Sequence, residues 1–453
     1  MNIKEIKKAY FIGIKGSGMT AVAEILKNHG IEVSGSDISE KFFTDAVLRT
    51  NNINFSEYFS ADNIPNDADL IIYSTAYSEK NNPEIIEARK RNVPILSYPE
   101  ALGKLFEEKL GIAVCGTHGK TTTSAMLAES LKSAGVDPSA IVGSKVIGWQ
   151  GSSLAGNGEY FVAEADEYQN KLQYYNPLGA VLTSVDWDHP DFFPTVQEYE
   201  KTFADFVAKI PMHGFLIFSG DDADAERISK SANCTVLSYG FSENSDYRIE
   251  KKEKKSFEIF FDSESLGEFK INQLGKHNIQ NAAAAISVCH KLKLDLDKVR
   301  EALKNFQGTS RRFEYIGERN GAILIDDYAH HPAEIKVTLK AAREKYPEKN
   351  IWTIFHPHTF TRTKALLEDF AQSFDDANNV IIIDIYGSAR EEQGGVSSKE
   401  LVDLINKYNH DKAEYIPDIR RVIDFLGNKI GENDVVISMG AGDVWRVVDK
   451  LKK

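Results

Sequence analysis

The stretch Gly116-Thr-His-Gly-Lys-Thr-Thr122 stands between the apolar run Ile112–Cys115 and a segment of helical periodicity, Thr121–Ser133. A glycine-rich turn between a buried strand and a helix directs backbone N–H groups and the helix N-terminus toward an anion. Lys120 would contact the β- and γ-phosphates of a nucleotide, and the Thr121 hydroxyl would reach Mg²⁺. The loop is of the shorter Gly-Thr-x-Gly-Lys-Thr kind, and it predicts a phosphate-binding α/β domain.

Strand and helix signals alternate on both sides of this loop. Apolar runs that predict strands precede it at 9–13, 31–35, 70–74 and 93–96, and follow it at 160–163 and 180–183. Alternating apolar residues within 247–274 predict a hairpin, and helices are expected at 278–292 and 297–305. Four more strands are expected at 323–325, 351–355, 380–383 and 435–438. This βαβ rhythm favours parallel, doubly wound sheets.

We therefore predict the α/β class with three domains. Residues 1–107 form a Rossmann-like N-terminal domain. Residues 108–308 form a central P-loop domain with a parallel sheet and a small β subdomain. Residues 309–453 form a Rossmann-like C-terminal domain.

The charge balance, the cysteine count and the lengths of the apolar runs exclude several classes of protein. The 453 residues carry 54 lysines and arginines against 67 aspartates and glutamates, for a formal net charge of −13. Such a balance argues against a general nucleic-acid binder. Three widely spaced cysteines form neither a disulfide framework nor a CxxC metal pair, which indicates a reducing compartment. Because no run approaches the length of a membrane span, we expect a cytoplasmic protein with no membrane partner.

Carboxylates follow two further predicted strands. Glu164-Ala-Asp-Glu167 stands at a strand end, where a phosphate-loop enzyme would hold its magnesium, although exposed acids would look the same. His189, in Asp186-Trp-Asp-His189, is a second metal ligand, a phosphate contact or a structural histidine. Asn278 is expected to cap a helix, and Asn281 on the same helix face suits an adenine edge.

The first loop, Gly13-Ile-Lys-Gly-Ser-Gly18, also follows a strand and opens a helix. It is similar to a dinucleotide fingerprint, with Lys15 in place of the second glycine. Asp37 closes the next strand near the expected position of a ribose-binding acid. The pattern predicts that a diphosphate docks here, with the Lys15 side chain either contacting it or turned away.

Polar clusters mark the strand ends of the last region. They are Arg311-Arg312, Asp326-Asp-Tyr-Ala-His-His-Pro332, His356-Pro-His358 and Thr361-Arg-Thr363. Arginines in such positions suit phosphate or carboxylate groups. Zinc is disfavoured, because neither carboxylate nor cysteine lies at ligand spacing within a helix.

In combination and in order, these motifs resemble those of the Mur ligase family of peptidoglycan precursor synthesis, over nearly the whole chain. The resemblance rests on 13–19, 35–37, 116–122, 164–167, 188–189, 277–278, Asn281, 311–313, 326–332 and 440–443. It implies an ATP-dependent carboxylate–amine ligase that joins L-alanine to UDP-N-acetylmuramate through an acyl phosphate, releasing ADP and phosphate. It also implies ATP and Mg²⁺ as cofactors, small-molecule partners only, and a monomer or weak homodimer.

The resemblance further implies roles for single residues. The catalytic set would be Lys120, Glu164, His189, Arg312, Asp327 and His330, with Mg²⁺ held by Thr121, Glu164 and His189. ATP would contact Gly116, Thr117, His118, Gly119, Lys120, Thr121, Thr122, Asn281, Arg312 and Asp327. The UDP-sugar would contact Gly13, Lys15, Gly16, Ser17, Gly18, Met19, Asp37 and Ser74. L-Alanine would contact His330, His358 and Arg362.

Three positions depart from the family pattern. Lys15 replaces a glycine, Thr359 replaces an arginine, and Tyr168 follows Glu167 where the alanine-adding members have serine. The alternatives are therefore a Mur-type ligase for another amino acid or a recycled tripeptide, and, from other classes, a nicotinamide-dependent dehydrogenase or a nucleotide-binding switch. The separate phosphate loop disfavours the dehydrogenase, and the C-terminal clusters disfavour the switch.

Overall fold

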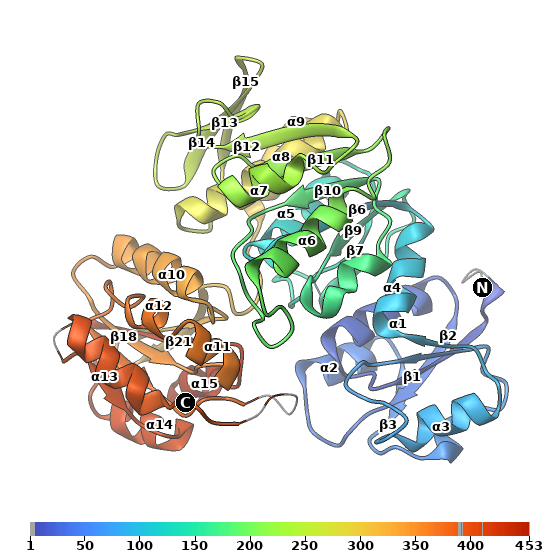
Figure 1. The fold of residues 1–453 in the computed structure, drawn as a ribbon, viewed down its shortest axis with the longest axis horizontal. Coiled ribbons are helices and arrows are strands. Elements are labelled where there is room, and N and C mark those ends of the chain that lie inside the picture. Colours follow the sequence, from blue (N-terminus) through green and yellow to red (C-terminus); the bar gives the residue numbers. More distant parts are fainter. Residues whose placement is uncertain (1–4, 150, 388–390, 392, 410, 453) are drawn as a thin grey trace. The chain divides into compact units, whose positions relative to one another are not determined.

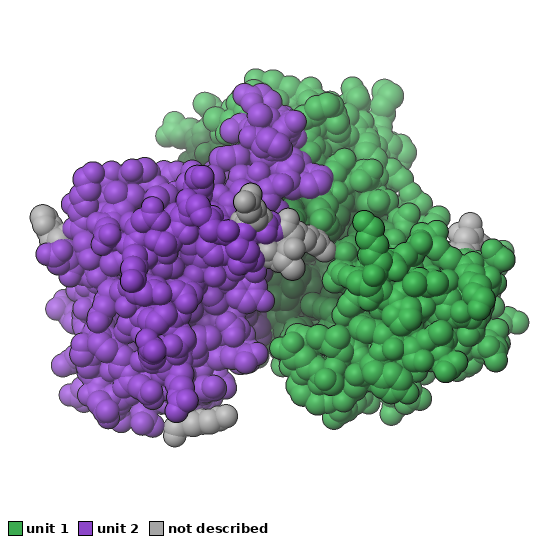
Figure 2. All heavy atoms as spheres, turned by 60° about the horizontal axis from the view of Figure 1, so that its bottom comes forward, with its two compact units in different colours: residues 1–185, 200–272, 280–307 green, residues 186–199, 273–279, 308–453 purple. Residues whose placement is uncertain are grey.

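The computed structural model describes residues 5–149, 151–387, 391, 393–409 and 411–452. The described chain is α/β, with three sheets of which most strands run parallel (Figure 1). Its residues cluster into two compact units, coloured separately in Figure 2. Unit 1 comprises 1–185, 200–272 and 280–307, and unit 2 comprises 186–199, 273–279 and 308–453. Within the described residues, every helix is too short or too polar to cross a membrane.

The first sheet lies in unit 1 and is parallel throughout, in the order β3-β2-β1-β4-β5. Its strands are β1 (Lys8–Ile12), β2 (Glu32–Ser36), β3 (Asn54–Ser56), β4 (Leu70–Tyr73) and β5 (Ile95–Ser97). The helices between them are α1 (Ser17–Asn28), α2 (Phe43–Thr50), α3 (Pro83–Lys90) and α4 (Tyr98–Glu107). After Lys8, the central strand β1 is apolar and buried, which is typical of a sheet covered on both faces.

The second sheet also lies in unit 1, in the order β15-β14-β13-β12-β11-β10-β6-β9-β7-β8. Its strands are β6 (Leu110–Cys115), β7 (Ser139–Ile141), β8 (Ser153–Leu154), β9 (Tyr160–Glu164), β10 (Gly179–Leu182), β11 (Phe215–Ser219), β12 (Thr235–Gly240), β13 (Tyr247–Lys251), β14 (Ser256–Phe261) and β15 (Glu264–Lys270). The pairs β7–β8, β13–β14 and β14–β15 are antiparallel, and the other pairs are parallel. The associated helices are α5 (Lys120–Ser133), the 3₁₀ segment η3 (Tyr168–Tyr174), α6 (Val196–Val207), α7 (Ala223–Ser229), α8 (Lys276–Lys291) and α9 (Leu296–Asn305).

The third sheet lies in unit 2, in the order β16-β17-β21-β18-β19-β20, and only the β16–β17 pair is antiparallel. Its strands are β16 (Glu314–Arg319), β17 (Ala322–Asp327), β18 (Asn350–Phe355), β19 (Asn379–Ile382), β20 (Ala413–Tyr415) and β21 (Asp434–Met439). Its helices are α10 (Pro332–Lys345), α11 (Phe360–Ala365), α12 (Leu367–Ala371), α13 (Ser398–Asn409), α14 (Ile419–Gly427) and α15 (Trp445–Leu451). Successive residues of β17 enter different apolar clusters, Leu324 in one and Ile325 in the other, so both faces of this sheet are covered.

The predicted α/β class is confirmed, and the structure corrects one local detail. Asn278 was expected as a helix cap, but α8 already begins at Lys276. The Asn278 side chain lies in the first turn and donates to the Leu274 carbonyl (2.7 Å). Gly275, with φ of +94°, directly precedes the helix and forms the sharp turn into it, a conformation that glycine adopts without strain.

Candidate active site

The phosphate loop of unit 1 can be formed only with glycine at two positions. Gly116 has φ of +124°, and a Cβ there would lie 2.3 Å from the Thr183 hydroxyl oxygen. Gly119 has φ of +81°, immediately precedes α5, and a Cβ there would lie 2.5 Å from the Asn281 amide oxygen. Both residues adopt the left-handed backbone that side chains disfavour. The loop therefore keeps the backbone at the start of α5 bare, as an anion-binding turn requires.

The predicted loop residues lie together at this turn. The Thr117 amide donates to the Ser184 carbonyl (2.8 Å), and the His118 amide donates to the Ser184 hydroxyl (3.0 Å). Thr121 and Thr122 are buried in the first turn of α5. Two backbone donors are thus fixed by the segment that follows β10, which holds the loop in one conformation.

Lys120 is the cation of this turn. Its ammonium donates to the carbonyls of Gly116 and Thr117 and to the Glu167 carboxylate (2.9 Å). Burial alone would lower the pKa of Lys120, but the carboxylates, Glu167 first, outweigh it and hold the pKa above its ordinary value. The lysine therefore stays charged at neutral pH, next to the N-terminus of α5.

A hydroxyl–carboxylate pair lies beside the lysine. The Thr121 hydroxyl donates to Glu164 Oε1 (2.9 Å), and Glu164 Oε2 accepts from the Gly143 amide (2.5 Å). Glu164 is the last residue of β9, so a strand end and a helix start supply the two oxygens. Both are hard oxygen donors, the ligand type that Mg²⁺ prefers.

Asn281 lies against the other side of the phosphate loop. Its amide oxygen accepts from the Thr123 hydroxyl (3.2 Å) and is the atom that a Cβ at Gly119 would meet. The predicted role of Asn281 in contacting adenine stays a prediction. Its observed contacts stabilise the turn that presents Gly119.

The predicted sugar-nucleotide residues gather at the carboxyl ends of β1, β2 and β4. Gly13 has φ of +82°, and a Cβ there would lie 2.7 Å from the Tyr77 ring and 2.9 Å from the Ser74 side chain. Asp37 accepts from the Lys15 amide (2.6 Å) and the Ile38 amide (2.8 Å). The other predicted residues at this edge lie at the start of α1: Gly16, Ser17, Gly18 and Met19.

The side chain of Lys15 is the exception at this edge. Its ammonium is fully buried and contacts groups of its own sheet region, among them the Ile38 carbonyl (2.8 Å) and the Glu40 carbonyl (2.9 Å). The sequence leaves open whether Lys15 contacts a diphosphate or is turned away. In the structure its ammonium is hydrogen-bonded to groups of the protein itself.

In unit 2, Arg362 organises a buried charged cluster. Its guanidinium donates to both carboxylate oxygens of Asp188 (2.7 and 3.2 Å) and lies 3.2 Å from His358 Nδ1 and 3.4 Å from His189 Nδ1. Burial would raise the pKa of Asp188, but Arg362 outweighs it and holds that pKa well below its usual range. Burial and Arg362 lower the pKa of His358 to about 3, so this imidazole is neutral at physiological pH. The ring of His358 stacks on that of Tyr386 (5.6 Å, 13°).

A second polar group of unit 2 surrounds the end of β17. Asp327 accepts from the amides of Phe313 (2.7 Å) and Ala329 (2.7 Å), and burial raises its pKa to about 6. The guanidinium of Arg312 lies over the Tyr328 ring (5.2 Å). His330 Nδ1 lies 3.2 Å from the Glu334 carboxylate. Asp327, Arg312 and His330, all predicted site residues, thus lie around the end of β17, with Arg312 contributed by the segment before β16.

Three residues that the sequence interpretation did not assign belong to these clusters. Glu334, in the first turn of α10, pairs with His330, and the i, i+4 spacing after His330 could have indicated it. Tyr386 comes from a loop with no motif to mark it. Thr359, at the position of a family arginine, has φ of +67° and caps α11 by accepting from the Arg362 amide (3.3 Å). Its side chain holds the helix that carries Arg362.

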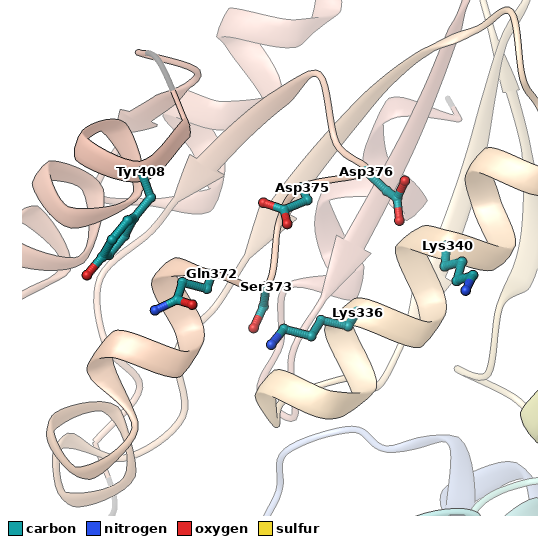
Figure 3. Close-up of a pocket in the computed structure, with 7 residues that line it drawn as sticks. All are labelled: Lys336, Lys340, Gln372, Ser373, Asp375, Asp376 and Tyr408. Carbon is teal, nitrogen blue, oxygen red and sulfur yellow. The ribbon is translucent and has the colours of Figure 1, made fainter.

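A separate hollow of about 520 Å³ lies on unit 2 (Figure 3). It is lined by Lys336, Lys340, Gln372, Ser373, Asp375, Asp376 and Tyr408. The two lysines come from α10 and the two aspartates from the loop after α12, so its charges balance. It includes none of the predicted site residues and has no concentrated charge, so we do not assign it to the reaction.

Comparisons with known proteins cover most of the chain. Family models match at residues 8–110 (Mur ligase family, catalytic domain), 114–289 (Mur ligase middle domain) and 311–442 (Mur ligase, glutamate ligase domain). The UDP-N-acetylmuramate–L-alanine ligase of Desulfitobacterium hafniense is 40% identical over 98% of both chains. That of Clostridium acetobutylicum is 38% identical over 97% of this chain and 96% of the relative. A crystal structure of the UDP-N-acetylmuramate–alanine ligase of Thermotoga maritima superposes with a TM-score of 0.82 at 28% identity, covering 98% of each chain.

Proposed function

Because this chain belongs to the Mur ligase family, we propose that it is an ATP-dependent ligase that joins L-alanine to UDP-N-acetylmuramate in peptidoglycan precursor synthesis. The observation that carries this proposal is the turn at the start of α5. There a charged, partly buried Lys120 and the Thr121–Glu164 pair meet around a bare backbone loop. The relatives that are similar over nearly the full chain carry the same activity in their names.

In this proposal each sheet region takes one substrate. Residues 1–107 bind the sugar nucleotide through the start of α1 and Asp37. Residues 108–308 bind ATP through the loop from Gly116 to Thr122. Residues 309–453 bind L-alanine, with the Asp188–His189 segment contributing to that region because it clusters with unit 2. Arg312 and Asp327 serve the nucleotide from the C-terminal region. The enzyme acts in the cytoplasm as a monomer or weak homodimer.

The reaction needs activation of a carboxylate. At neutral pH the carboxylate of the sugar nucleotide is a poor electrophile, so its oxygen attacks the γ-phosphorus of ATP and ADP leaves. The L-alanine amine then attacks the acyl phosphate carbon, loses a proton, and inorganic phosphate leaves. In the first step two anions approach each other. Lys120 lowers that barrier by placing a fixed positive charge beside the phosphate loop.

Magnesium fits the oxygen donors of this site. Thr121 and Glu164 would hold the ion, and their oxygens, which lie 2.9 Å apart, are of the donor type it requires. His189 is proposed as a second ligand. When bound, Mg²⁺ would neutralise phosphate charge.

The buried cluster around Arg362 supports the proposed amino-acid site. A bidentate guanidinium recognises a carboxylate geometrically, and here Asp188 holds that guanidinium in a fixed plane. Neutral His358 offers an imidazole that carries no competing charge toward an amine. His330, fixed by Glu334, is proposed to complete the pocket.

The test is phosphate release from ATP and Mg²⁺ with UDP-N-acetylmuramate, across single amino acids and the tripeptide L-alanyl-γ-D-glutamyl-meso-diaminopimelate. We expect release with L-alanine alone, together with a product heavier by one alanine residue. Release only with the tripeptide would instead assign the recycling activity, for which Tyr168 is the observation in favour. Release with none of these acceptors would contradict the proposal.

A further inference from the structure

Lys15 in the first loop has a buried ammonium with an unusually complete set of partners. Its side chain is 0% exposed. The ammonium donates to the carbonyls of Ile38 (2.8 Å) and Glu40 (2.9 Å), and it lies 3.2 Å from Asp45 and 3.3 Å from Glu57. An ammonium removed from water is costly unless it is paired and hydrogen-bonded, and here both conditions are met.

The backbone of Lys15 contacts the same segment. Its amide donates to Asp37 (2.6 Å), and its carbonyl accepts from the Thr44 hydroxyl (2.6 Å). Every polar group of this residue is therefore joined to the stretch from Asp37 to Asp45 or to the carboxylate of Glu57 beside it. Such convergence indicates a residue that holds a segment in place.

The segment it contacts has little apolar packing of its own. Residues 38–43 are all exposed, and they include Ile38 (40%), Phe42 (41%) and Phe43 (49%). Burial resumes only at Thr44 and Asp45. Because the hydrophobic effect does not fix residues 38–43, their backbone position depends on hydrogen bonds, and the ammonium of Lys15 supplies two of them.

We propose that Lys15 is a positioning residue: it fixes residues 38–43 beside the carboxylate of Asp37, so that the uridine end of the sugar nucleotide meets a preorganised surface. This differs from the direct contact with the sugar nucleotide that the family resemblance implies for Lys15. The inference rests on the proposed function for its substrate. The conformational entropy of residues 38–43 is then lost when the protein folds. Binding of the sugar nucleotide does not have to offset that loss.

The test compares two lysines that face the same acids. Lys15→Met removes the buried ammonium while keeping much of the side-chain volume. Lys41→Met is the matched control, because Lys41 also pairs with Glu57 and lies 3.9 Å from Asp45 but is 61% exposed. Both variants lose one positive charge at the same two carboxylates. Hydrogen exchange of the amides of residues 38–45 is measured in each full-length protein, without ligand.

We expect exchange of the 38–45 amides to be faster by about tenfold or more in Lys15→Met and unchanged in Lys41→Met. In steady-state assays, the KM for UDP-N-acetylmuramate should rise by about tenfold in Lys15→Met, while kcat and the KM for ATP change by less than about threefold. Lys15→Arg, which retains the charge, should recover part of the loss. A purely structural defect would lower kcat and raise both KM values together.

Several results would overturn the proposal. They are unchanged exchange in Lys15→Met, equal effects in Lys41→Met, or weaker sugar-nucleotide binding with unchanged exchange, which would indicate direct contact with the ligand. If the methionine variant does not fold, Lys15→Ala leaves room for water on the two carbonyls and is measured instead. Rapid exchange of residues 38–45 in the wild-type protein would contradict the proposal without any variant. The exchange measurements need no turnover, so they remain decisive even if the proposed ligase activity is wrong.

Discussion

The phosphate loop of unit 1 and the Arg362 cluster of unit 2 both hold a positive charge in a fixed position, but they are built differently. The loop is one continuous stretch whose shape follows from two glycines with positive φ. The cluster joins Asp188 to Arg362, which lie 174 positions apart in the chain. In the phosphate loop, the backbone conformation positions the charge of Lys120. In the cluster, the ion pair between Arg362 and Asp188 joins two distant segments of the backbone. The loop should therefore be sensitive to backbone changes, and the cluster to the geometry of one side chain.

The largest effect is expected for Lys120→Ala. Losing the fixed charge at the phosphate should reduce kcat by about 10³-fold or more, because the developing charge is no longer stabilised. Phosphate release and a thermal melt are the measurements. Lys171→Ala is the matched control, since Lys171 pairs with the nearby Asp166 but lies outside the loop. Wild-type-like ATP consumption in Lys120→Ala would contradict the phosphate-loop assignment.

Arg362→Lys should have the next largest effect. The charge is retained, but the two parallel hydrogen bonds to Asp188 and the contact with His358 are not. We expect the KM for L-alanine to rise by about 10- to 100-fold, with the KM for ATP nearly unchanged.

Arg421→Lys, an exposed arginine paired with Asp418, serves as the control for Arg362→Lys. An equal rise in the KM for ATP and the KM for L-alanine would contradict a specific role of Arg362 in binding L-alanine.

Gly119→Ala tests the backbone side of the comparison. The left-handed conformation should cost about 1–2 kcal/mol, and the added methyl group would collide with Asn281. We expect a lower Tm together with weaker ATP binding, measured by calorimetry. Gly135→Ala is the control for strain alone, because Gly135 has φ of +84° and open space around its Cβ position. Equal loss of ATP affinity in both variants would contradict a specific role for the loop.

The smallest effect concerns Asp327 and pH. Burial raises its pKa to about 6, so the folded protein binds the proton more tightly than the unfolded chain, where the pKa is about 4. This contribution to stability is fully present below about pH 4 and is lost as the pH rises through about 6. The Tm of the wild type relative to Asp327→Asn should therefore fall between pH 4 and pH 6.5. A difference that does not vary with pH would contradict the assignment, and Asp375→Asn on the exposed loop is the control.

The same contrast explains what the sequence could and could not predict. The loop from Gly116 to Thr122 is local, so residue spacing was enough to indicate both its strand–turn–helix setting and the placement of Lys120. The partnership of Arg362 with Asp188 depends on how distant segments pack, so spacing gave the residues singly and missed the pair. Tyr386 had no motif at all. For Lys15, spacing marked an unusual residue, but only the structure shows where its ammonium goes.

The clustering of residues 186–199 with the C-terminal sheet bears on how this protein can be divided. A fragment cut at residue 309 would carry Arg362 but not Asp188, and its buried guanidinium would lack the carboxylate that compensates it. Gene fusions, split reporters and isolated-domain crystallisation usually assume that a module is a continuous length of chain. Here the smallest module that keeps its charges paired is discontinuous, so such a fragment should be soluble only when the 186–199 stretch is supplied with it.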